Sequence, residues 1–148
     1  MKHNTESTKT LKRFSFDEAN AMLPLVRSIV SDIREVFRAV TSRRTDLRRL
    51  IRKRDRRAGQ VYDDEVAESR ADLQEEYDQI WRYREELESL GVLLRQPDDG
   101  WIEFPASILG HDAFYSWQLG EEVVAFWRES DAPWTQRKAV LTSDTEDH

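Results

Sequence analysis

LVRSIVSDIREVFRAVTSRRTDLRRLIRKRDRR, residues 25–57, and QVYDDEVAESRADLQEEYDQIWRYREELESL, residues 60–90, are the two stretches that decide the fold. Apolar residues in the first stretch recur in alternating steps of four and three with one polar interruption at Arg44, and those in the second lie seven apart. This spacing places a narrow apolar seam along one side of a helix. The seam residues are Val26, Val30, Ile33, Phe37, Val40, Leu47 and Ile51 in the first stretch, and Val66, Leu73, Ile80 and Leu87 in the second.

The two stretches therefore predict a pair of long helices, the first of them roughly 50 Å long at 1.5 Å per residue. Between them lies Ala58-Gly59-Gln60, where the glycine can end a helix at low steric cost. Because this loop is short, we expect an antiparallel hairpin with coiled-coil packing.

Charge is divided unequally between the predicted helices. Arg43–Arg57 holds nine Lys or Arg and two Asp, whereas Asp63–Asp78 holds eight acids and one Arg. An antiparallel hairpin places the two segments side by side, so we expect the acids to pair with the basic run and mask its field. Nucleic-acid binding through the basic run is therefore the weakest functional hypothesis, and no nucleic-acid partner is expected.

Composition favours one water-exposed domain. The chain has 148 residues, of which 35% are charged, and a net charge of −6. The absence of cysteine excludes disulfides and thiolate metal sites and fits a reducing compartment. The start, Met1–Arg13, has no apolar core typical of a secretory signal, and the longest apolar run, Val123–Trp127, is too short to cross a membrane. We expect a cytoplasmic protein with no membrane partner.

Residues 1–13 and 142–148 are polar and predicted to be disordered tails, which leaves a single domain over 14–141 with the hairpin at 24–90. Ser15 and Glu18 have the spacing of a capping box, which predicts a short helix over Asp17–Met22. Pro24 lacks an amide donor and disfavours a helical residue before it, so we expect a kink or a restart after Met22, with Pro24 in the first turn of the long helix.

The region 92–134 predicts a small antiparallel sheet. Four strands are expected, at Val92–Arg95, Trp101–Phe104, Phe114–Leu119 and Val123–Arg128, with Pro105 ending the second and a helical turn as the alternative for the fourth. Turns are expected at Pro97–Gly100, Gly110–Asp112 and Gly120–Glu122. The fold class is therefore α+β, with the base of the helical hairpin packed on the sheet.

Two stretches carry a family resemblance. One is residues 16–26, FDEANAMLPLV; the other runs from Gly100 through FPA at 104–106 and WQLGE at 117–121 to Phe126-Trp127 and Asp131-Ala132. With these residues the chain resembles a bacterial group known only as domain-of-unknown-function family 2203. The resemblance implies a soluble cytoplasmic protein without an established activity. In the family pattern a cysteine commonly precedes the tryptophan at 117 and a histidine commonly follows the one at 127; Ser116 and Arg128 stand there in this chain, so a metal held by that pair would lose its ligands.

The residues give no catalytic signature. His111-Asp112 could be an acid–base pair or two metal ligands, but a turn explains both residues, and no third or fourth ligand has a recognisable spacing. We therefore expect no metal and no cofactor.

An aromatic sheet face is the better candidate for binding a flat ligand or a protein partner. Alternation places Trp101, Phe114 and Trp127 opposite Ile102, Phe104, Tyr115 and Trp117, although ordinary core packing would also use such residues. The candidate residues are Trp101, Glu103, His111, Ser116, Trp117, Glu121, Trp127 and Arg128.

Three functions follow in order of preference. The first is a non-enzymatic interaction or scaffolding module that forms a homodimer, with a further protein partner possible. The second is a small-ligand or metal-binding protein that uses the aromatic face. The third is nucleic-acid binding through the basic run.

Overall fold

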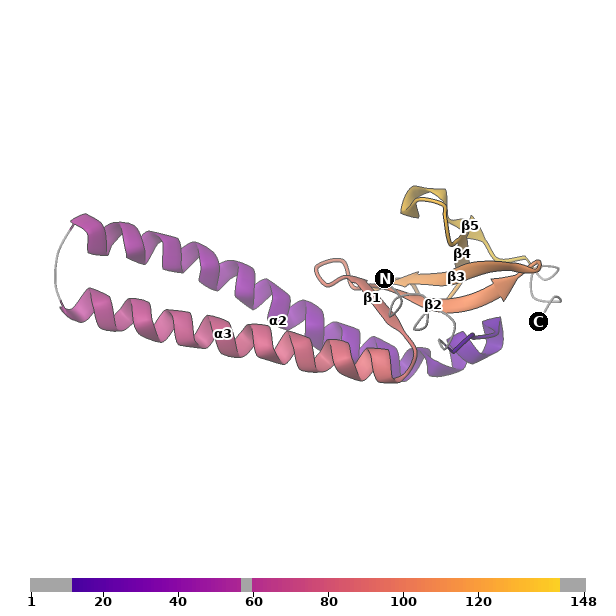
Figure 1. Ribbon diagram of the computed structural model, residues 1–148, viewed down its shortest axis with the longest axis horizontal. Helices are drawn as coiled ribbons and strands as arrows, with labels where there is room; N and C mark the ends of the chain where they lie inside the picture. Colours follow the sequence, from indigo (N-terminus) through magenta and orange to yellow (C-terminus); the bar gives the residue numbers. More distant parts are fainter. Residues whose placement is uncertain (1–11, 57–59, 142–148) are drawn as a thin grey trace, which may run out of the picture.

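The computed structural model describes residues 12–56 and 60–141. The expected tails, apart from Lys12 and Arg13, and the expected turn at Ala58-Gly59 lie outside the described residues. Figure 1 shows a long two-helix arm projecting from a head that contains the sheet. The α+β class and the helical hairpin are confirmed.

Helix α2 (Phe16–Arg56) is continuous, so the expected separate helix over Asp17–Met22 is wrong. The capping box is present, with the Ser15 amide donating to Glu18 Oε1 at 2.8 Å and the Glu18 amide donating to Ser15 Oγ at 3.1 Å. Pro24 lies exposed within the helix, while Leu23 and Val26 on either side are buried. Burial of the flanking turns against the sheet keeps the helix continuous through a proline that local propensity alone would use as a break.

Helix α3 (Gln60–Ser89) returns antiparallel along α2. It ends before Gly91, whose φ of +88° is a backbone conformation that glycine adopts at little cost, and the Val92 amide donates to the Leu87 carbonyl. The apolar seam is thin: among the described residues of α3 and of α2 beyond Ile33, only Val40, Val66 and Leu87 are buried. The other seam residues are half-buried.

The sheet has five antiparallel strands in the order β1-β2-β3-β4-β5. They are β1 (Leu93–Gln96), β2 (Trp101–Ile108), β3 (His111–Gln118), β4 (Phe126–Glu129) and β5 (Lys138–Ala139), with a 3-10 helix η1 (Trp134–Gln136) before the last. Strand β4 confirms a strand in place of a helical turn, although it begins three residues later than expected, and β5 was not expected. The turn between β2 and β3 is Leu109-Gly110, with φ of 54° and 77°, so His111 and Asp112 belong to a strand. Positive φ at both turn residues is typical of the two-residue hairpin turn whose twist matches that of the strands.

Strand β2 runs through Pro105 and does not end there, which corrects the expected boundary. Strand β1 pairs only with residues 101–103 of β2, so the edge of β2 beyond Glu103 has no neighbouring strand. The Pro105 carbonyl accepts a hydrogen bond at 2.7 Å from the Phe14 amide on that edge. In an antiparallel strand the N–H and C=O of one residue point the same way, so the amide that proline lacks would also have faced the open edge.

The core lies between α2 and one face of the sheet (Figure 1). Its sheet residues alternate along β2 and β3 and include Ile102, Phe104, Tyr115 and Trp117, each 0% exposed. No helix within 12–56 or 60–141 is long and apolar enough to span a membrane.

Candidate functional site

The sheet face turned away from α2 is organised around a buried carboxylate. Glu103 is 0% exposed. Arg128 donates from Nε to Oε2 and from Nη2 to Oε1, both at 2.7 Å, and Arg95 Nε donates to Oε1 at 2.8 Å. Both guanidinium groups also lie 4.9 Å from the centre of the Phe114 ring. A carboxylate that accepts a bidentate pair and a third charge-assisted bond is held rigidly, which suits a structural role better than proton transfer.

The aromatic part of this face is covered by the chain's own C-terminal segment. The ring centres of Trp101 and Trp134 lie 3.7 Å apart, and Trp101 Nε1 donates to Ser116 Oγ at 3.1 Å. Arg137 lies 4.3 Å from the ring centres of both Phe126 and Trp134 and donates to Glu121 at 2.9 Å. The expected open aromatic platform is therefore largely closed by η1 and the residue that follows it.

The candidate residues from the sequence divide into two groups. Trp101, Glu103, Ser116, Glu121 and Arg128 belong to the outer face or its edge and form the contacts just described. The remaining three, Trp117, Trp127 and His111, do not join them.

The prediction that Trp127 lies on the face opposite Tyr115 is wrong. Trp127 pairs in register with Tyr115 and so lies on the helix-covered face. Trp117 is fully buried on the same face, with Nε1 donating to the Glu121 carbonyl at 3.0 Å. His111 is exposed at the start of β3, opposite Ile108.

Sequence reasoning missed Arg95, Trp134 and Arg137. Arg95 lies two residues after Leu93, which pairs with Glu103, so the alternation of a strand places it on the same face. Trp134 and Arg137 lie in an irregular segment, where no periodicity indicates a face.

Ser116 and Arg128 both lie beside the buried carboxylate. Ser116 pairs with Glu103 across β2 and β3, and Arg128 binds the same carboxylate. Over the described part of the chain, no group of three or more His, Cys, Asp or Glu could hold a metal ion.

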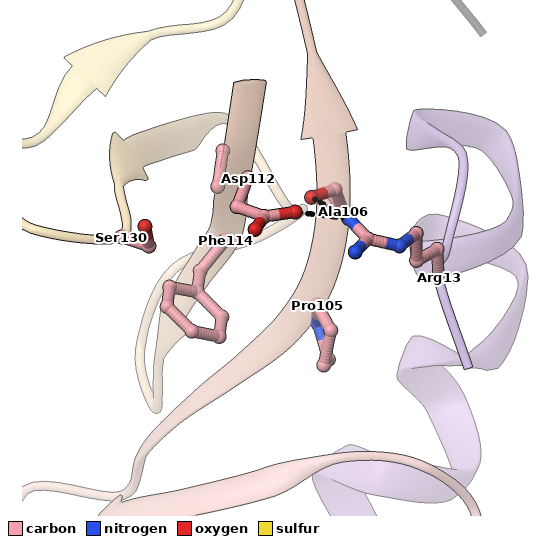
Figure 2. A pocket seen from close by; sticks show the side chains of 7 residues that line it. Arg13, Pro105, Ala106, Asp112, Phe114 and Ser130 are labelled. Atoms are coloured by element: carbon pink, nitrogen blue, oxygen red, sulfur yellow. Dashed lines mark hydrogen bonds and ion pairs between the residues drawn. The ribbon is translucent and has the colours of Figure 1, made fainter. Parts of the chain in front are cut away.

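An opening remains at the other end of this face (Figure 2). It is a cavity of about 120 Å³ lined by Pro105, Ala106, Ala113 and Phe114, with Arg13, Asp112 and Ser130 at its rim. Arg13 crosses β2 to donate to Asp112 at 2.5 Å and to the Ala106 carbonyl at 3.4 Å. The floor is apolar and the rim carries one charge of each sign, so the cavity suits a small, mainly apolar molecule with one polar group.

The arm carries the charge division expected from the sequence, but few of the expected ion pairs. Arg43 donates to Glu76 at 2.8 Å and to Asp72 at 3.5 Å, and Arg54 lies 4.0 Å from Asp63. The hydrogen bond to Glu76 and the nearby Asp72 charge raise the pKa of Arg43 above its ordinary value. No other ion pair joins the two helices within 16–56 and 60–89, so the expected pairing of the acids with the basic run is limited to these contacts.

These features define a class: an α+β protein with a helical-hairpin arm and a head whose buried Glu103 carboxylate is already paired with two arginines. The family described as "Uncharacterized conserved protein (DUF2203)" matches residues 12–140, and the chain belongs to that family. Searches among curated proteins and among solved structures found no match.

Proposed function

We propose that the protein is a non-enzymatic interaction module of the cytoplasm that associates with itself through the helical arm. The thin seam supports this proposal most directly. Phe37, Leu47, Leu50 and Ile51 on α2 and Leu73, Tyr77 and Ile80 on α3 are only half-buried in one copy of the chain.

A two-helix arm can bury its seam from one side only, whereas a four-helix arrangement surrounds it. Each additional Å² of apolar surface removed from water contributes about 25 cal/mol. Several half-buried large side chains per arm therefore favour association of two arms over an arm that projects alone into water.

The head supports a non-enzymatic role. Its buried carboxylate is bound by two guanidinium groups, and Trp117 and Trp127 lie in the core. His111 and Asp112 are exposed at the end of a hairpin, where Asp112 is paired with Arg13.

Shortening the arm tests the proposal. Deleting residues 47–53 and 64–70 removes one heptad from each helix, keeps the seam in phase, and shortens the arm by about 10 Å. The full chain is expected to sediment as a dimer at micromolar concentration, and the shortened chain to dissociate at least tenfold more readily while the head keeps its stability. A full chain that stays monomeric at those concentrations would overturn the proposal.

A DNA titration distinguishes the weakest alternative. Net charge −6 and the acids of α3 beside the basic run are expected to prevent tight binding at physiological salt. Tight binding with a steep salt dependence, lost on Arg48→Ala and Arg52→Ala, would favour nucleic acid instead.

Small-molecule binding is a second candidate, supported by the cavity between Pro105 and Phe114. A cavity near 150 Å³ is known to accept a benzene-sized molecule, so this one suits a single ring with a hydroxyl at the Arg13–Asp112 rim. Ligand-observed NMR with phenol checks it, with Ser130→Leu to fill the cavity; equal signals from both proteins would exclude this site.

A further inference from the structure

The two helices of the arm carry opposite net charge, and most of it is not used within one copy. Helix α2 holds eleven Lys or Arg and six acids, whereas α3 holds eleven acids and three Arg. The ion pairs that cross between the helices involve Arg43 and Arg54. Within residues 16–56 and 60–89, the remaining charged side chains form no ion pair with the other helix.

The opposite charges are also concentrated at the same end of the arm. Residues 43–56 of α2 hold eight Lys or Arg and two Asp, and residues 63–78 of α3 hold eight acids and one Arg. Toward the head, residues 31–42 of α2 are balanced, with two Arg and two acids. The outer half of the arm is therefore positive along one helix and negative along the other.

We propose that two copies of the chain pair with their arms pointing the same way, so that each α2 lies between its own α3 and the α3 of the second copy. This inference rests on the proposed self-association and adds its geometry. A two-fold axis along the arms gives an antiparallel four-helix bundle in which like-charged helices are diagonal and opposite charges are adjacent.

The position of the charges selects this geometry over the arrangement in which arms overlap fully in opposite directions. That arrangement places each charged outer half against the balanced inner half of the other copy. Arms that overlap only at their tips would bring the charges together but leave Tyr77, Ile80 and Tyr83, nearer the head, half-exposed. Arms pointing the same way place opposite charges side by side and cover the seam along its full length. They also bring the two heads to one end of the dimer.

Charge reversal on exposed positions provides the test. The ion pairs of Arg43 and Arg54 set the register, so residues 49–53 lie opposite about 64–68. One variant carries Arg49→Glu, Arg52→Glu and Lys53→Glu; the other carries Asp64→Lys, Glu65→Lys and Glu68→Lys. All six side chains are exposed, and none pairs with the opposite helix among the described residues.

Each variant alone is expected to raise the dimer dissociation constant at least tenfold, because like charges then face each other between copies. Mixing the two variants is expected to restore a mixed dimer, and a chain with all six reversals is expected to dimerise as the wild type does. Glu85→Lys, Glu86→Lys and Glu88→Lys form a matched control with the same charge change at the balanced end, and should have a small effect. Circular dichroism checks that every variant keeps its helices.

Small-angle X-ray scattering of the wild-type dimer then fixes the direction. Arms pointing the same way give a longest dimension close to that of one copy, whereas opposed arms place a head at each end and give a longer particle. A dimer whose longest dimension exceeds that of one copy by about a head, or whose dissociation constant does not change on charge reversal, overturns this geometry while leaving self-association intact. A wild-type chain that is monomeric overturns the proposed function as well.

Discussion

Replacing Arg128 with Met tests how strongly the buried ion pair holds the head together. The change removes the guanidinium but keeps an unbranched apolar side chain of similar length. Glu103, with no exposed surface, would lose two of its three guanidinium hydrogen bonds and keep the one from Arg95. The Ala132 carbonyl would also lose its 2.7 Å bond from Arg128.

Breaking a buried ion pair by removing one partner costs about 3–5 kcal/mol, because a charge is left without compensation. Arg95 remains, so we expect the lower end of that range, about 3 kcal/mol. A domain has a total stability of about 5–15 kcal/mol, so the loss should move the urea midpoint substantially. Tryptophan fluorescence is a suitable signal because Trp101, Trp117 and Trp127 all lie in the head.

The companion variant Glu103→Leu with Arg128→Met removes both charges. This double variant should recover at least half of the stability that Arg128→Met alone loses, since replacing both members of a buried pair by apolar groups is often close to neutral. A loss of stability below about 1 kcal/mol for Arg128→Met alone, or a double variant that is less stable than the single one, would refute the reasoning.

Three further outcomes are expected. Trp117→Ala should destabilise the protein by about 3–5 kcal/mol in urea unfolding, because it empties a fully buried site; unchanged stability with a lost ligand would instead make Trp117 a recognition residue. Pro24→Ala should raise the thermal midpoint, since it restores a backbone donor inside a continuous helix and gains about 2 kcal/mol, and a lower midpoint would show that the helix needs the proline. Chelator-treated protein should take up no stoichiometric zinc by elemental analysis, and zinc that is lost on His111→Ala would contradict this.

The helical arm could be predicted from the sequence because its information is periodic. Seven-residue spacing identifies the two helices, and a glycine marks the end of the second at Gly91. Pro24 and Pro105 misled the prediction for one reason. Each was interpreted as a local break, whereas burial on either side of Pro24 and an open edge beside Pro105 decide the outcome, and both depend on distant parts of the chain.

The head could be predicted only in part. Alternation along β2 and β3 correctly separates Glu103 and Ser116 from the core residues, but it does not reveal that β4 begins at Phe126. The pairing of Trp127 with Tyr115 and of Arg128 with Phe114 places Trp127 on the covered face and Arg128 on the outer one. Ion pairs between helices were overestimated for a related reason: net charge along a segment says nothing of which side of a helix each residue occupies.

Pro105 has a consequence for how the protein behaves in a crowded solution. The part of β2 beyond β1 is a sheet edge, and such edges readily recruit strands from other molecules into aggregates. Pro105 removes a donor that an incoming strand would need, and the Phe14 amide already occupies the Pro105 carbonyl on that edge. Removing residues 1–14 together with Pro105→Val should therefore expose a sheet edge that can pair with other strands. Phe14 and Pro105, which cover this edge, would then also be what prevents the protein from aggregating.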